Sequence, residues 1–185
     1  MKKNSFKLDT RTMVFLGLLI SMHIVLTRLV VIDIGAYRIS VGSVCTILAG
    51  LWFGPIGGGI CGFVSDILGC LLKGYAINPF ITVAAILWGV IPALVRNMYT
   101  NSKKKKTAAL CGSIVLASIA SSLIFTTMGL VLMLGYNFYA IMPGRIVQWA
   151  IMTPMYCVLT TILYYSPLTR LVNVMMVSHK PAPNA

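Results

Sequence analysis

The sequence has few charged residues, and acidic residues are the scarcest. Only 10% of its 185 residues are Asp, Glu, Lys or Arg, and only three of these are acidic. An ordinary soluble domain carries about 25% charged residues, so this chain is not expected to fold as one in water. Hydrophobic residues make up 58% of the chain. Disordered chains have too few apolar residues to form a core, so disorder is excluded as well.

Signatures of catalysis and of metal binding are also missing. The chain has no GxxxxGK[ST] phosphate loop, no HExxH and no GxSxG. Its carboxylates, Asp9, Asp33 and Asp66, are far apart and have no evident partner histidine. The cysteines follow no metal-binding spacing and lie in apolar stretches, which indicates packing residues: Cys45, Cys61, Cys70, Cys111 and Cys157. We therefore expect no enzyme, no ATPase activity and no resident metal or cofactor.

Long apolar segments fill most of the chain. A helix needs about 20 apolar residues to cross a hydrocarbon core of roughly 30 Å. Gly54-Pro55 divides one long segment, because Pro cannot continue the helical hydrogen-bond ladder. We predict an all-α integral membrane protein with six transmembrane helices, at residues 13–32, 39–53, 56–72 and 80–98, within 107–134, and at 143–165. Residues 1–185 form one membrane domain, with a core at 13–168, an N-terminal segment at 1–12 and a tail at 169–185.

The basic residues predict the orientation. Eleven of the 15 lie in three clusters outside the apolar segments: Lys2, Lys3, Lys7 and Arg11; Arg96 and Lys103 to Lys106; Arg170 and Lys180. With six spans, all three clusters face the same side, and the positive-inside rule makes that side cytoplasmic. Both termini are therefore predicted to be cytoplasmic. A nucleic-acid-binding protein would instead spread its cations over the folded body, so we expect no nucleic-acid partner.

Four further cations are predicted to lie at the opposite side of the membrane: Arg28, Arg38, Lys73 and Arg145. Each has an ordinary explanation. Arg28 could reach the lipid headgroups or pair with Asp33, Lys73 could end a helix, and Arg145 could anchor one at the interface. Because all four converge on one side that should hold few cations, they favour an outward, water-filled pocket for an anionic solute.

Asp66 lies inside a predicted span. It precedes Lys73 by seven residues, so it is about 10 Å deeper along the helix. Two interpretations stay open for a carboxylate at this depth. It forms a structural ion pair or hydrogen bonds within the protein, or it accepts hydrogen bonds from N–H groups of a ligand.

Two sets of residues share a helical face by their spacing. Arg145, Gln148 and Trp149 combine a cation, an amide and an aromatic plate, which suits a planar, polar and anionic ligand. Packing or lipid contact is the alternative role of Trp149. Gly17 and Ser21 are four residues apart and allow another helix to approach closely, although such pairs often arise by chance.

Short strings along the chain resemble a known family. Their order and spacing carry the resemblance, over roughly residues 12–168: Tyr37-Arg38-Ile39-Ser40, Leu48-Ala49-Gly50, Phe53-Gly54-Pro55, Gly62, Asp66-Ile67-Leu68-Gly69, Asn78-Pro79-Phe80-Ile81-Thr82, Pro143-Gly144-Arg145-Ile146 and Met152-Thr153-Pro154. The chain resembles the substrate-binding (S) component of energy-coupling factor (ECF) transporters, and among these the folate-specific members.

The resemblance implies a bacterial plasma-membrane protein that works with a transmembrane coupling subunit and two cytoplasmic ATPases. Folate would be captured outside, and the partners would hydrolyse ATP. Asp66 would accept hydrogen bonds from the pterin ring, and Trp149 and Phe80 would stack on the rings. The two carboxylates of the glutamate tail would meet Arg28, Arg38, Lys73 or Arg145. Further expected binding residues are Tyr37, as part of a gate, Asn78 and Gln148, and Gly17 and Ser21 would face the coupling subunit.

Two alternatives stay open at this point. The chain could be an S component for another vitamin, such as pantothenate, which is anionic but has no ring for Asp66 and Trp149. It could also be a stand-alone secondary transporter of an organic anion, which would need ion coupling and no partner subunits. We see no internal repeat of the kind that many secondary transporters carry.

Overall fold

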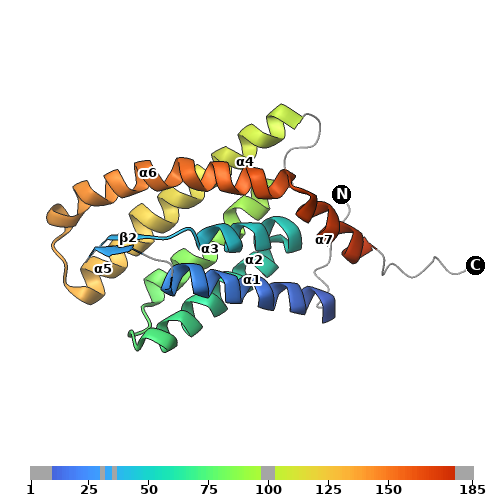
Figure 1. Cartoon of the computed structure of the whole chain (residues 1–185). Coiled ribbons are helices and arrows are strands. Elements are labelled where there is room, and N and C mark those ends of the chain that lie inside the picture. Colours follow the sequence, from blue (N-terminus) through green and yellow to red (C-terminus); the bar gives the residue numbers. More distant parts are fainter. Residues whose placement is uncertain (1–9, 30–31, 35–36, 97–102, 178–185) are drawn as a thin grey trace, which may run out of the picture.

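The fold is a bundle of helices with one short β-hairpin (Figure 1). The computed structural model describes residues 10–29, 32–34, 37–96 and 103–177, and their side chains except at 32–39, 96, 103–106, 173 and 175–177. The elements in chain order are α1 (Thr10–Arg28), β1 (Ile32–Ile34), β2 (Tyr37–Ile39), α2 (Ser43–Lys73), α3 (Pro79–Arg96), α4 (Lys103–Ser118), the π-helix η1 (Ile119–Thr126), α5 (Thr127–Leu134), α6 (Phe138–Tyr165) and α7 (Pro167–Val177).

Among the described residues, four helical segments are long and apolar enough to cross a membrane. They are Thr10–Arg28, Ser43–Lys73, the continuous rod Thr107–Leu134 and Phe138–Tyr165, while Pro79–Val95 in α3 is apolar but shorter. Large apolar side chains point away from the bundle, among them Val14 and Ile151 with 65% and 63% of their surface exposed. The prediction of a helical membrane protein therefore agrees with the structure. The hairpin, whose strands pair Asp33 with Arg38 in antiparallel register, was not predicted.

The helix α2 reverses direction at Gly54. This glycine has φ 87° and ψ −179°, outside the helical region, and Pro55 follows it. A Cβ placed on Gly58 would lie only 2.7 Å from the Cα of Gly50. Residues eight apart in a continuous helix would be about 12 Å apart, so the chain folds back on itself. The break lies where Gly54-Pro55 predicted it, and the first arm, residues 43–53, is only roughly 16 Å long.

Glycines let α2 and α3 pack backbone against backbone. A Cβ on Gly58 would lie 2.7 Å from the carbonyl oxygen of Gly89, and one on Gly62 would lie 2.7 Å from the carbonyl carbon of Ala85. We call this contact the glycine seam; it comprises Gly50, Gly58 and Gly62 of α2 and Gly89 of α3. Such close approach lets main-chain atoms contact each other directly, as small residues do between membrane helices.

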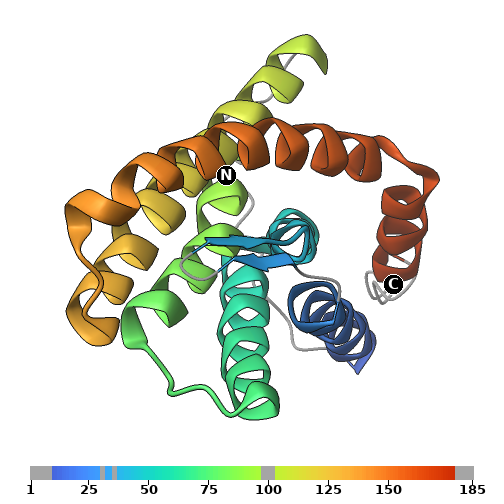
Figure 2. The ribbon, with the colours of Figure 1, turned by 60° about the vertical axis from the view of Figure 1, so that its left-hand side comes forward.

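The two ends of the bundle differ (Figure 1). One end, here called the hairpin end, carries the β-hairpin, the turn from α2 to α3 and the turn from α5 to α6. The start of α1, the end of α3 and α7 lie at the other end. There, Trp52 Nε1 donates to Thr169 Oγ1 at 3.1 Å and ties α7 to the first arm of α2. Figure 2 shows α6 arching past the hairpin and α2.

Candidate ligand-binding site

A cavity of about 510 Å³ lies between α1, α2, α3, η1 and α6. Pockets for small molecules commonly have volumes of 300–1,000 Å³, so a molecule of vitamin size fits. Its lining combines apolar and aromatic side chains with a few polar ones from each helix. The predicted binding residues that line it are Arg28, Asp66, Asn78, Arg145, Gln148 and Trp149.

Asp66 is buried in the α2 wall, with 8% of its surface exposed. The hydroxyl of Thr82 on α3 donates to Asp66 Oδ2 at 2.7 Å. The other oxygen, Oδ1, has weaker partners: Arg28 Nη2 at 3.9 Å and the thiol of Cys70 at 4.0 Å. One oxygen of this carboxylate is thus held within the protein, and the other retains capacity for a stronger donor.

Arg28 turns into the bundle instead of reaching outward. It ends α1, yet only 9% of its side chain is exposed. Its Nη2 also lies 3.7 Å from Cys70 Sγ, and its guanidinium carbon lies 5.9 Å from the ring centre of Tyr75. Headgroup contact, one of the ordinary roles considered for it, does not fit this burial.

Asn78 joins two elements of the wall. Its side-chain oxygen accepts from the backbone N–H of Phe80 at 3.0 Å, capping the start of α3, where Pro79 is a favoured first residue. Its amide nitrogen donates to the carbonyl of Gly129 on α5 at 2.9 Å. Although Asn78 lines the cavity, these bonds fix the α2–α3 turn, so its main role in this structure is to hold the wall in place.

The facing wall is formed by α6. Arg145, Gln148 and Trp149 all line the cavity, and Arg145 has only 7% of its surface exposed. Trp149 Nε1 donates to Ser118 Oγ at 2.9 Å, and Thr153 Oγ1 donates to the same oxygen at 3.2 Å. The first bond orients the indole of Trp149, which lines the cavity, and the second helps to hold Ser118 in place.

A π-helix supplies the neighbouring part of that wall. Ser122 and Thr126 of η1 line the cavity, as does Ser118, the residue that immediately precedes η1. Thr126 Oγ1 donates to the carbonyl of Ser121 at 2.7 Å, five residues earlier. Helices with this i to i+5 hydrogen-bond pattern are rare and occur often at functional sites. Sequence reasoning missed this feature, because no local residue pattern distinguishes a π-helix from an α-helix.

Further residues that the sequence did not single out close the cavity beneath the hairpin. Tyr156 OH donates to the carbonyl of Ser40 at 2.7 Å, and Ser40 Oγ donates to the carbonyl of Leu26 at 2.9 Å. The ring of Tyr156 meets Trp88 edge-on at 5.0 Å. These contacts tie α6 to the segment after β2. The Tyr156–Ser40 bond joins residues 116 positions apart, so only the fold reveals it.

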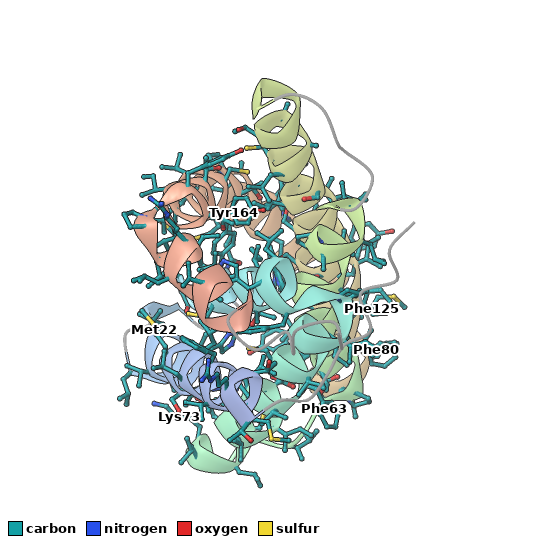
Figure 3. The ribbon with its side chains drawn as sticks, turned by 90° about the vertical axis from the view of Figure 1, so that its right-hand side faces the viewer. Met22, Phe63, Lys73, Phe80, Phe125 and Tyr164 are labelled. Carbon is teal, nitrogen blue, oxygen red and sulfur yellow. The ribbon has the colours of Figure 1, made fainter. Side chains whose placement is uncertain are left out.

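Two expected binding residues lie outside the cavity. Phe80 projects from the outer edge of the bundle, as Phe125 does (Figure 3), because the cavity-facing stripe of α3 is Ile81, Ala84, Ala85 and Trp88. Phe80 is off that stripe by its helical phase. Lys73 is exposed where Gly74, with φ 66°, ends α2. The placement of these two is therefore corrected: neither contacts the cavity in this structure.

Four other expected residues lie on the hairpin or on the surface of α1. The side chains of Tyr37 and Arg38 lie outside the described residues. Gly17 and Ser21 are exposed on α1, where Ser21 Oγ donates to the carbonyl of Gly17 at 2.9 Å. A Cβ on Gly17 would meet nothing within 4 Å. This face of α1 is free for another helix. Across the described part of the chain, no three His, Cys, Asp or Glu side chains gather to hold a metal ion.

Comparison with known proteins shows the family. Residues 11–164 match the family described as ECF transporter, substrate-specific component. The chain is 27% identical over 148 residues to the folate transporter FolT of Clostridium novyi (strain NT), which covers 79% of this chain and 83% of that protein.

Solved structures agree with this assignment. A crystal structure of FolT bound with folic acid is similar with a TM-score of 0.71 and 27% identity, covering 84% of this chain and 93% of that one. The S component of a bacterial ECF transporter shares the fold with a TM-score of 0.62 and 22% identity, over 90% of this chain and 98% of that one. The family match covers most of the sequence and the fold agrees with it, so this chain belongs to the substrate-specific (S) components of ECF transporters.

Proposed function

We propose that this chain is the folate-binding S component of an ECF-type vitamin importer. The observation that carries the proposal is the composition of one cavity: it brings the buried carboxylate of Asp66 together with two buried arginines, Arg28 and Arg145, and the indole of Trp149. A pterin ring joined to an anionic tail matches these groups. Similarity to FolT, whose structure with folic acid has the same fold, supports the assignment.

The pterin would lie deep, with its N–H and amino group directed at Asp66 Oδ1 and its ring stacked on Trp149. The glutamate carboxylates would point towards the hairpin end. Arginine binds carboxylates through two parallel hydrogen bonds, which suits Arg28 and Arg145 for the tail. Gln148 would add an amide hydrogen bond, and Tyr37 and Arg38 would belong to a gate formed by the hairpin.

The proposed topology has six spans with both termini in the cytoplasm. The direction of the chain alternates through α1, the two arms of α2, α3, the rod from α4 to α5, and α6 (Figure 1). The hairpin end then faces outward, and the basic clusters face the cytoplasm of a bacterium, beneath its plasma membrane.

Transport would need partners that this chain does not supply. As an S component, it would assemble with a transmembrane coupling subunit and two cytoplasmic ATPases, and these would hydrolyse ATP. The exposed face of α1 at Gly17 and Ser21 would contact the coupling subunit. Replacing both with Leu should abolish co-purification with the ECF module and leave folate affinity unchanged. Met22→Phe, also on the exposed surface of α1, is the control. Loss of folate binding together with assembly would instead indicate misfolding.

Isothermal titration of the purified chain in detergent, without partners, tests the folate assignment. Folate should bind tightly and with one-to-one stoichiometry, whereas pantothenate, riboflavin and thiamine should not. Tight binding of one of these other vitamins would replace folate as the substrate. Absence of binding to a folded sample would favour the stand-alone transporter.

A further inference from the structure

The guanidinium of Arg28 lies against α2 because residue 69 is a glycine. A Cβ on Gly69 would lie 2.5 Å from Arg28 Nε and 3.0 Å from Arg28 Cζ. Any other residue at this position would push the guanidinium away from Asp66. Gly69 thus leaves the space in the cavity wall that the Arg28 side chain occupies.

The pair that Arg28 forms with Asp66 is loose. Their closest atoms, Nη2 and Oδ1, are 3.9 Å apart, whereas charge-assisted hydrogen bonds between such groups measure about 2.7–2.9 Å. Arg28 Nε is buried and has no hydrogen-bond partner among the described residues. Buried charges are costly unless they are well paired and hydrogen-bonded. Both groups therefore retain binding capacity that a ligand can use.

The two candidate partners of Asp66 have the same hydrogen-bonding pattern. A guanidinium presents two parallel N–H donors to a carboxylate. The pyrimidinone edge of a pterin also presents a ring N–H beside an amino group, but it is neutral. Arg28 and the ligand ring therefore compete for one oxygen of Asp66, because Thr82 already occupies the other.

We infer that Arg28 is an exchangeable counter-ion: it neutralises Asp66 in the empty cavity and moves to a carboxylate of the ligand when the ring takes its place. Arg28 ends α1 at the hairpin end, so its side chain can rotate towards the ligand tail. With a ligand that has both a ring and an anionic tail, Arg28 pairs with a tail carboxylate while Asp66 accepts hydrogen bonds from the ring and from Thr82. A ligand that has the ring but no tail displaces Arg28 from Asp66 and leaves the buried guanidinium without a counter-ion. Arg28 therefore disfavours the binding of such a ligand. The inference rests on the proposed folate-binding function.

The test compares folate with 6-methylpterin, which has the ring edge and no carboxylate, by equilibrium titration of the detergent-purified chain. Arg28→Met should weaken folate binding by about tenfold or more, the loss of one charge-assisted contact. The same variant should bind 6-methylpterin more tightly than the wild type, by at least about threefold, because the competitor for Asp66 is gone. Opposite changes for the two ligands distinguish exchange from other roles.

A second variant tests the same inference in case Arg28→Met does not fold. Gly69→Ala keeps Arg28 but displaces its guanidinium from the space beside residue 69. This variant should strengthen 6-methylpterin binding, and it should weaken folate binding less than Arg28→Met does. Arg170→Met, an exposed arginine on α7, is the matched control and should change neither affinity.

Three results would overturn the inference. If Arg28→Met weakens folate and leaves 6-methylpterin unchanged, Arg28 only contacts the tail. If both ligands weaken together in both variants, Arg28 and Gly69 are structural. If the folded wild type binds no folate, the proposed function fails, and the exchange fails with it.

Discussion

The two walls of the cavity are built in different ways. The wall formed by α2 and α3 rests on the glycine seam, where main chains contact each other, and it holds Asp66 through the short bond from Thr82. The wall formed by α6 and η1 is joined by serine and threonine hydroxyls, and it includes a π-helical stretch. At the glycine seam of the first wall main-chain atoms meet, and these cannot readjust as side chains do, whereas the second wall can repack its hydroxyls and long side chains.

This difference assigns separate tasks to the two walls. In the proposed complex, Asp66 accepts hydrogen bonds from two donors of the ring and therefore needs a fixed position, which the glycine seam provides. In the same proposal, the wall that carries Arg145, Gln148 and Trp149 contacts the ligand through side chains, which can adjust more readily than the main-chain contacts of the seam. Changes in the seam should therefore affect folding, while changes on α6 and Ser118 should affect binding and leave the fold intact.

Gly58→Ala should have the largest effect. Its Cβ would overlap the main chain of both Gly50 and Gly89, which cannot move aside as a side chain would. Overpacking of this kind costs about 1–3 kcal/mol, so thermal unfolding in detergent should occur at a clearly lower temperature. Gly112→Ala is the matched control, because its Cβ would meet nothing within 4 Å and alanine favours a helix. Equal melting temperatures for the two variants would contradict the rigid seam.

Asp66→Asn should weaken folate binding by more than about tenfold without unfolding the protein. The amide removes the negative charge and offers donors to the ring's own donors, so a charge-assisted interaction is lost. Titration of the variant beside the wild type checks this, with the melting temperature as the measure of folding. Unchanged affinity would remove Asp66 from the site.

Arg145→Met tests the second wall with two ligands. Folate carries a glutamate tail that pteroate lacks, so the wild type should bind pteroate more weakly than folate. If Arg145 binds the tail, the variant should reduce that preference several-fold, which corresponds to about 1 kcal/mol. Equal binding of folate and pteroate by the wild type would show that the buried arginines do not recognise the glutamate.

Ser118→Ala should have the smallest effect. It removes the oxygen that accepts from Trp149 Nε1 and Thr153 Oγ1, so the indole loses its orientation and keeps its stacking surface. Folate affinity should fall by roughly two- to fivefold, close to the value of one neutral hydrogen bond. A loss as large as that of Asp66→Asn would mean that the α6 wall is as rigid as the seam.

Some of the fold follows from local sequence. Apolar length predicts the helices, and Gly54-Pro55 predicts the reversal in α2, because a glycine that can adopt positive φ and a proline without an N–H are both local properties. The spacing of Arg145, Gln148 and Trp149 likewise places them on one side of α6, and the structure turns that side to the cavity.

Other features depend on contacts between distant residues. Thr82 on α3 donates to Asp66 on the adjacent helix α2, and Tyr156 on α6 donates to Ser40 across the bundle. Neither partner could be selected from the sequence. Phe80 was expected to stack on the ligand because of its neighbours in the chain, but its helical phase turns it outward (Figure 3). The π-helix and the hairpin have no distinctive local pattern, and the paired roles of Arg28 and Gly69 appear only when α1 packs on α2.

A crystal structure of the purified chain with folic acid bound would test the proposed site most directly. The pterin edge should lie within hydrogen-bond distance of Asp66, its ring should contact Trp149, and the glutamate carboxylates should point to the hairpin end. A ligand bound elsewhere, or one whose ring lies away from Asp66 with the Thr82 bond unchanged, would show that Asp66 does not bind the ring.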